Sequence, residues 1–140
     1  MKIAIYYDGI KYRLRNSKKI LKILEKVIRE YRKPAGNLSF ILTTDENLLP
    51  INREFMKHNY FTDVIAFDYG DGKTLDGEIY ISLDTIKKNA DNYKVSLRNE
   101  LLRVMIHGTL HVCGFEDDTK EKKDIMHSLE DRWMVEMKGI

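Results

Sequence analysis

The chain has 140 residues, of which 33% are charged and 43% hydrophobic, a composition typical of a globular protein that buries a core of its own. It has no apolar run near the ~20 residues that cross a bilayer, and its first residues lack a signal-peptide pattern. Cys113 is the only cysteine, which excludes an intrachain disulfide. These features predict one domain over residues 1–140, cytoplasmic and without a membrane partner.

Positive and negative charges are unevenly distributed along the chain. Residues 1–60 hold 13 Lys and Arg against 6 Asp and Glu, whereas residues 61–140 hold 11 against 16. Much of the positive excess falls between Lys11 and Lys33. A basic face can attract a phosphate backbone, but this charge pattern by itself favours a solvated amphipathic helix.

The N-terminal part of the chain alternates between patterns typical of strands and of helices. Ile and Tyr dominate the first segment, as in strands, and apolar residues then recur every three or four positions, as on one face of a helix. Ser17 can cap that helix, and Thr44 or Asp45 can cap the next one. The expected elements in chain order are a strand over residues 2–7, a helix over 18–32, a strand over 38–43 and a helix ending near 57.

The remaining chain predicts a hairpin followed by helices. The expected elements are strands over residues 64–68 and 78–82 joined by a glycine-rich loop, then helices over 85–92, 97–112 and 120–137, capped by Asp84, Ser96 and Thr119. In the last helix the residues expected to face inward are Ile125, Met126, Leu129 and Trp133. This order predicts an α/β (α+β) fold with a single mixed sheet of about four strands packed with about five helices.

The end of the helix over residues 97–112 holds the most informative pattern in the sequence. His107 and His111 are four positions apart, so they share one helix face and lie about 6 Å apart along the axis. Gly114 follows where the helix should stop, because glycine adopts the left-handed conformation at little cost. The chain can then turn back and bring Asp117, or its neighbour Asp118, to the same ion. Two imidazoles, one carboxylate and an open fourth position are typical of a catalytic zinc site.

The same ligand spacing occurs in the metzincin proteases, whose motif is H-E-x-x-H-x-x-G-x-x-H. The glutamate that serves there as the general base is replaced here by Gly108. The pattern therefore predicts one bound divalent metal ion, with zinc expected, but not standard peptidase chemistry. The alternative is a pair of core histidines that are hydrogen-bonded to backbone carbonyls.

Residues 107–117 read H-G-T-L-H-V-C-G-F-E-D and resemble the hallmark H-G-x-L-H-L-x-G-Y-D-H of the YbeY family, the bacterial rRNA-maturation endoribonucleases. Two further segments agree in order and spacing with this family. Residues 52–55 and 62–67 resemble its N-x-x-Y and T-D-V-L-S-F segments, and residues 77–81 resemble its G-D-I-x-I strand. The resemblance extends over about residues 40–140 and implies a zinc-dependent endoribonuclease in rRNA maturation and ribosome biogenesis, with ribosomal RNA or the ribosome as partner.

The resemblance also implies roles for particular residues. The third motif histidine falls on Asp117, a departure that a carboxylate ligand can accommodate. The arginine that usually follows the N-x-x-Y segment falls on Met56, so the expected substrate-binding residues are Arg53, Lys57 and His58. A metal-bound water is one candidate attacking group and the RNA 2′-OH is the other, and no catalytic side chain is assigned.

Two other functions stay open at this point. The protein could be a ribosome- or RNA-associated factor with a structural zinc, or a metal-dependent hydrolase of another bond, such as a peptidase. Glu100 lies about two turns before His107 on the same helix face, so it is either an acceptor for an imidazole N–H or a surface charge. The sequence does not predict the oligomeric state.

Overall fold

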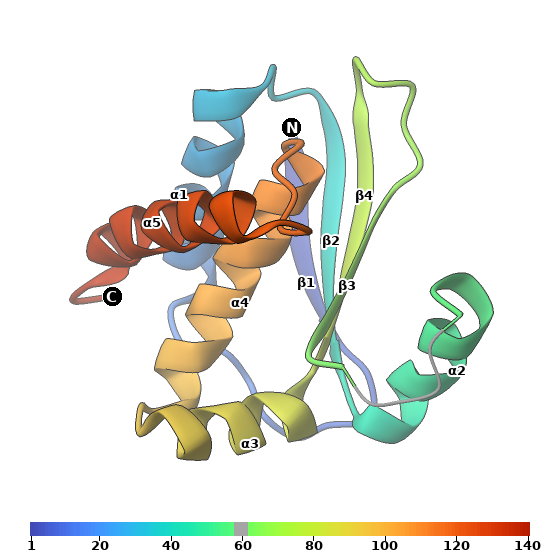
Figure 1. Ribbon diagram of the computed structural model, residues 1–140, viewed down its shortest axis with the longest axis vertical. Helices are drawn as coiled ribbons and strands as arrows, with labels where there is room; N and C mark the ends of the chain where they lie inside the picture. The colour runs from blue at the N-terminus through green and yellow to red at the C-terminus, as the bar shows by residue number, and fades with distance from the viewer. Residues whose placement is uncertain (58–61) are drawn as a thin grey trace.

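The computed structural model describes residues 1–57 and 62–140 and arranges them as a β-sheet with helices packed on it (Figure 1). The described elements are, in chain order, β1 (Lys2–Tyr7), α1 (Ser17–Tyr31), β2 (Gly36–Thr43), α2 (Asp45–Phe55), β3 (Val64–Asp68), β4 (Leu75–Ser82), α3 (Leu83–Tyr93), α4 (Leu97–Val112) and α5 (Lys120–Met137). None of the helices in these described ranges is both long enough and apolar enough to span a membrane.

The sheet has the strand order β1-β2-β4-β3, in which β1, β2 and β4 run parallel and β3 runs antiparallel to β4. The mixed sheet with its helices confirms the expected α/β fold class, and the β3–β4 pair confirms the expected hairpin. β4 begins at Leu75, earlier than expected. The glycine-rich composition hid this extension. Gly77 pairs with Leu38 of β2, where an added Cβ would meet the Leu38 side chain at 2.9 Å.

Helices α1 and α4 pack on one face of the sheet and α5 packs across them, while α2 lies on the other side next to β4 and α3 (Figure 1). Successive side chains of each strand point to opposite faces of the sheet. In β2 the side chains of Leu38, Phe40 and Leu42 are fully buried in the same cluster as the apolar faces of α1 and α4. This shared core fixes α4 against the sheet, and α4 is the helix that bears the histidine pair.

Helix α4 is buried on most sides, since it contacts α1, α3 and α5 as well as β3 and β4. Gly108 faces the sheet, where an added Cβ would lie only 2.8 Å from Cγ2 of Ile79. Glycine is therefore what allows α4 to approach β4 this closely. The close approach brings His107 and His111 to the β3 edge of the sheet, where they share a pocket with β3 residues.

Several helix starts agree with the sequence, and two differ from it. Ser96 and Thr119 cap α4 and α5 as expected, each accepting a hydrogen bond from a backbone N–H of the first turn. Ser17 is instead the first residue of α1, because the preceding residue adopts a left-handed conformation and makes no side-chain cap. Ser82, rather than Asp84, caps α3, since the Asp84 carboxylate accepts the first N–H of α2 at 3.0 Å.

The inward face of α5 also differs from the expectation at one position. Ile125 is 54% exposed, so its predicted burial is wrong, whereas Met126 and Trp133 are buried as expected. The buried stripe of α5 runs through positions spaced by four, three and four residues: Met126, Glu130, Trp133 and Met137. A glutamate thus occupies a core-facing position, and its partner is a histidine of the candidate site.

Candidate metal centre

Helix α4 ends in a tight turn that reverses the chain. Gly114 has φ +100°, its N–H donates to the carbonyl of His111 at 3.0 Å, and the N–H of Phe115 donates to the carbonyl of Leu110 at 3.1 Å. This pair of bonds is the Schellman motif, which satisfies the last carbonyls of a helix and requires a left-handed residue. The expected helix stop at Gly114 is confirmed, and the turn carries the following acidic residues back toward the histidines.

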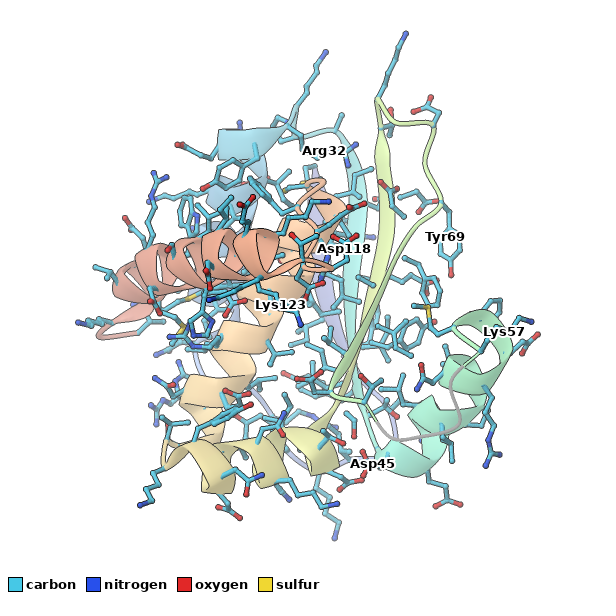
Figure 2. The ribbon with its side chains drawn as sticks, in the orientation of Figure 1. Arg32, Asp45, Lys57, Tyr69, Asp118 and Lys123 are labelled. Carbon is cyan, nitrogen blue, oxygen red and sulfur yellow. The ribbon has the colours of Figure 1, made fainter. Side chains whose placement is uncertain are left out.

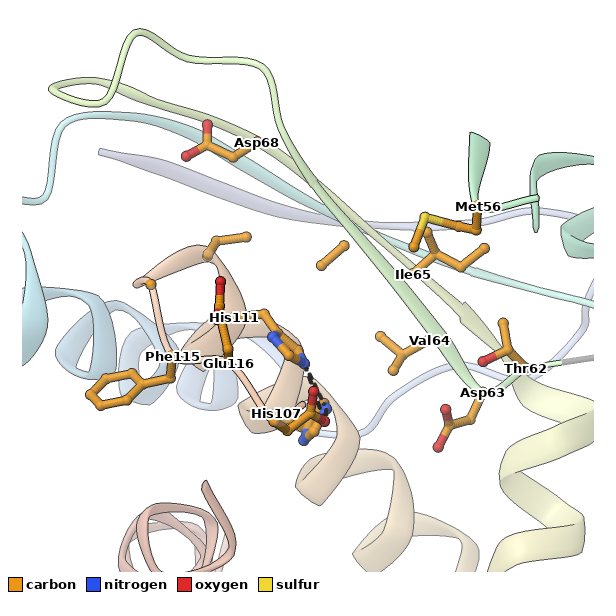
Figure 3. Close-up of a pocket in the computed structure, with 14 residues that line it drawn as sticks. Met56, Thr62, Asp63, Val64, Ile65, Asp68, His107, His111, Phe115 and Glu116 are labelled. Atoms are coloured by element: carbon orange, nitrogen blue, oxygen red, sulfur yellow. Dashed lines mark hydrogen bonds and ion pairs between the residues drawn. The ribbon is translucent and has the colours of Figure 1, made fainter. Parts of the chain in front are cut away.

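The turn brings Asp117 to His107 and His111. Oδ2 of Asp117 lies 3.4 Å from Nε2 of His107 and 3.6 Å from Nε2 of His111, and the two Nε2 atoms are 3.0 Å apart. Figure 3 shows the rings of His107 and His111 next to each other at the wall of the pocket. Ligand atoms that share one tetrahedral ion at about 2.1 Å are about 3.4 Å from one another. The measured separations lie close to this value, so the three side chains fit a single divalent cation.

Asp118 does not join this cluster. Its side chain is 67% exposed and forms an ion pair with Lys122 in the first turn of α5, at 3.1 Å. That pair holds the pKa of the Asp118 carboxyl below its usual range. Of the two candidate third ligands, the geometry therefore favours Asp117.

Each histidine is held by a second partner. Nδ1 of His107 lies 2.6 Å from Oε2 of Glu130, whose residue is only 5% exposed. Nε2 of His111 lies within hydrogen-bonding distance of Nε2 of His107, at 3.0 Å. With these contacts made, Nε2 of both rings faces Asp117. The histidines are thus oriented before any ion arrives.

The sequence did not reveal Glu130. Glu100 was expected to be either an acceptor for an imidazole N–H or a surface charge, but it is buried, and no hydrogen bond joins it to His107 in the described part of the chain. The signal for Glu130 was its position in α5, four residues after Met126 and three before Trp133. An acidic residue within an apolar helical stripe needs a buried partner.

Burial and charge set the protonation of the histidine pair. Burial lowers the pKa of His107, but the hydrogen bond to Glu130 and the charges of Asp117 and Asp63 outweigh it, so the pKa is raised. Burial and the adjacent charge of His107 lower the pKa of His111. The two rings are therefore expected to lose their protons at different pH values.

Metal uptake should weaken as the pH falls. The raised pKa of His107 lies above its ordinary value of 6.5, so below that pKa an incoming cation must displace a proton. Apparent zinc or cobalt affinity should then fall about tenfold per pH unit below the His107 pKa. Competition titrations against a chromophoric chelator at about pH 8, 7 and 6 measure this. Affinity that stays constant over this range would contradict the pKa shift.

A pocket of about 560 Å³ opens beside the histidines, between β3 and the turn after α4 (Figure 3). Its described walls contain four carboxylates, those of Asp63, Asp68, Glu116 and Asp117. Burial raises the pKa of Asp63. No Lys or Arg is among the described residues that line the pocket, so these walls offer a phosphate no fixed positive charge.

The substrate-binding roles expected of Arg53, Lys57 and His58 stay predictions. Arg53 is on α2 and Lys57 just beyond its end, and neither lines the pocket, whereas Met56 does. Figure 2 shows Lys57 at the tip of α2, to the right of β3 and β4, with Asp118 to their left at the start of α5. His58 lies outside the described residues.

Comparisons with known proteins identify the family of the chain. The family model described as Endoribonuclease YbeY matches residues 7–138. The chain is 37% identical over 132 residues to the Endoribonuclease YbeY of Parabacteroides distasonis, covering 94% of this chain and 93% of the relative. It is 39% identical over 129 residues to that of Flavobacterium psychrophilum, covering 92% and 91%.

A solved structure shares the fold as well. The solution structure of a protein from Thermotoga maritima superposes with a TM-score of 0.66 at 26% identity, covering 96% of this chain and 91% of that one. The agreement thus extends over nearly the whole length in both sequence and structure. The chain belongs to the YbeY family.

Proposed function

We propose that this protein is a zinc-dependent endoribonuclease that acts in rRNA maturation and ribosome biogenesis. The observation that supports it most directly is the cluster of His107, His111 and Asp117 on the wall of an open pocket. RNA as the substrate comes from the family, whose curated members are named endoribonucleases. A ribosomal substrate follows from the sequence resemblance described above.

The charges of the pocket explain why a cation is needed. Four carboxylates and no described lysine or arginine line it; Arg32 pairs with Asp68 and Lys122 with Glu116, which leaves Asp63 and Asp117 beside the histidines to disfavour a phosphodiester. His107, His111 and Asp117 would hold the cation. When bound, a divalent cation polarises a phosphoryl oxygen and lowers the pKa of water to ~7. RNA binding should therefore follow metal binding rather than precede it.

Asp63 is the residue best placed to move a proton. It directly precedes β3, lines the same pocket as His107, and is close enough for the charges of the two to interact. Burial raises its pKa, which suits a group that takes a proton from the attacking oxygen and returns it to the leaving oxygen. Asn89 donates a hydrogen bond to its Oδ2 at 3.3 Å and helps to fix the carboxylate.

Two observations weigh against the other functions. A structural zinc normally has four protein ligands, whereas residues 1–57 and 62–140 supply three to this cluster, which borders a pocket. A standard zinc peptidase needs a glutamate at Gly108, and an added Cβ there would already meet Ile79.

Cleavage assays on the metal-loaded protein test the proposal. The protein is incubated with a ribosomal RNA fragment and, separately, with a labelled peptide, before and after chelation and zinc restoration. RNA cleavage that is lost with the chelator and regained with zinc supports the proposal, provided that the peptide stays intact. Unfolding on metal removal with no cleavage at any loading would favour a structural zinc. Release of peptide with intact RNA would favour a different hydrolase.

The third ligand can be tested with two neighbouring carboxylates. Asp117→Ala should lower metal affinity about 10–100-fold or more, because it removes a direct donor. Asp118→Ala is the matched control and should bind metal like the wild type, because its carboxylate is exposed and paired with Lys122. Metal content after dialysis and competition titration measure both. Full metal retention in Asp117→Ala would show that the third ligand is wrongly assigned.

A further inference from the structure

Charged side chains of α4 and α5 contact one another in a row that begins at His107 and ends at the protein surface. Oε2 of Glu130 lies 2.6 Å from Nδ1 of His107, and Oε1 of the same carboxylate accepts from Nη1 of Arg103 at 3.3 Å. Nη2 of Arg103 then donates to Asp131 at 2.9 Å. Arg103 and His107 are one turn apart on α4, so one side chain of α5 contacts both.

Burial decreases along this chain of contacts. The side chain of Glu130 is 6% exposed, that of Arg103 is 27% exposed, and that of Asp131 is 63% exposed. His127, an exposed neighbour, lies 3.7 Å from Oε1. A buried carboxylate needs donors in fixed positions. Since each oxygen of Glu130 already has its own donor, the carboxylate cannot turn without losing one of them.

We propose that Glu130, held in place by Arg103, is a positioning residue that keeps the proton of His107 on Nδ1 and leaves Nε2 free to bind the metal. The inference depends on the metal site proposed above but not on RNA cleavage. A carboxylate can only accept, so the neutral imidazole beside it must carry its proton on Nδ1. The lone pair then lies on Nε2, the atom that faces Asp117.

Glu130→Gln separates this role from simple packing, because glutamine has nearly the same shape. Its amide has one acceptor oxygen, whereas the site has two donors. If the oxygen turns to Arg103, the amide NH₂ faces Nδ1 of His107 and drives the imidazole proton to Nε2. The metal-free variant should therefore contain His107 largely as the Nε2–H tautomer. Its zinc or cobalt affinity should fall about 10–100-fold.

The double variant Arg103→Met/Glu130→Gln tests the part played by Arg103. Without the guanidinium, the glutamine oxygen is free to accept from Nδ1 of His107. The double variant should thus return His107 to the Nδ1–H tautomer and bind metal more tightly than Glu130→Gln alone. A merely structural role predicts the opposite, since a second core change would add to the damage. Glu136→Gln, the same change at an exposed position of α5, is the matched control and should behave like the wild type.

Long-range ¹H–¹⁵N correlation spectra of the metal-free proteins at about pH 9 report the tautomer, and competition titrations report the metal affinity. The chain has 4 histidines, so the His107 signals can be assigned by their loss in His107→Gln. The proposal is supported if His107 carries its proton on Nδ1 in the wild type and on Nε2 in Glu130→Gln. The double variant should return the proton to Nδ1 and recover metal affinity. If His107 of the wild-type protein carries its proton on Nε2, the proposal is overturned without any variant. The proposal is also overturned if Glu130→Gln changes neither the His107 tautomer nor the metal affinity, and this result holds whether or not the protein cleaves RNA.

Discussion

Replacing His107 with alanine should abolish RNA cleavage while leaving the fold intact. The variant loses one of three ligands to the ion, and with it the stabilisation that a bound cation gives to the transition state. A loss of about 4 kcal/mol corresponds to roughly a thousandfold in kcat/KM. His111→Ala should have a similar effect, because its Nε2 lies as close to Asp117 as that of His107 does. Single-turnover cleavage and metal content, measured together, test this result.

The fold is expected to survive because the histidine side chains are at the edge of the core. They are 22% and 29% exposed, and they border a pocket rather than fill a packed space. Far-UV circular dichroism of both variants should therefore resemble that of the metal-free wild type. The thermal midpoint should match it in His111→Ala but fall in His107→Ala, because that change removes a donor from the buried Glu130 carboxylate. Asp118→Ala serves as the cleavage control from the same turn. Retention of more than about a tenth of wild-type cleavage in either histidine variant would contradict the proposed metal chemistry.

Gly108→Glu, which restores the glutamate of the zinc proteases, should unfold the protein instead of creating a peptidase. An added Cβ would lie 2.8 Å from Cγ2 and 3.2 Å from Cδ1 of Ile79, a fully buried residue of β4. The rest of the side chain would force an unpaired carboxylate between α4 and the sheet. Overpacking and the buried charge together should cost about 4 kcal/mol or more. Urea denaturation measures the loss.

Two smaller substitutions measure the cost of the contact between residue 108 and Ile79 alone. Gly108→Ala should destabilise the protein by about 1–2 kcal/mol, since the clash outweighs the higher helix propensity of alanine. The same change should cost less in an Ile79→Ala background, where the clashing methyl group is gone. Equal costs in the two backgrounds would show that Ile79 is not what requires the glycine.

Local sequence patterns predicted most of the fold. The strand over residues 64–68 and the helices over 97–112 and 120–137 have the bounds expected from apolar spacing and caps. The predictions that were wrong concern a helix cap and a buried position, both of which depend on contacts between elements. Asp84 looks like a cap but bonds to α2, and Ile125 looks apolar and inward but is exposed because Glu130 takes the buried position.

The sequence predicted those residues of the candidate site that lie close together along the chain. The two histidines share a helix face, and Gly114 marks the turn, so His107, His111 and a nearby acid could be named from spacing. The choice between Asp117 and Asp118 depends on the exact path of the chain after the turn, which spacing does not determine. Glu130 comes from another helix, 23 positions away from His107, and only the packing of α5 on α4 brings it there.

The substrate-binding roles of Arg53, Lys57 and His58 stay predictions. Arg53 and Lys57 were chosen because they are near Met56 in sequence, and neither is among the described residues that line the pocket. Arg32 lies closer to it, since its guanidinium pairs with Asp68 at 3.3 Å and donates to the carbonyl of Val112. Sequence spacing does not predict this contact, because Arg32 is 36 positions away from Asp68.

One divalent ion should be bound jointly by His107, His111 and Asp117. Anomalous diffraction from crystals of the zinc-loaded protein tests this directly. We expect a single strong peak within about 2.0–2.2 Å of Nε2 of each histidine and of a carboxylate oxygen of Asp117. A zinc peak elsewhere on the protein, or none between these three side chains at full loading, would contradict it.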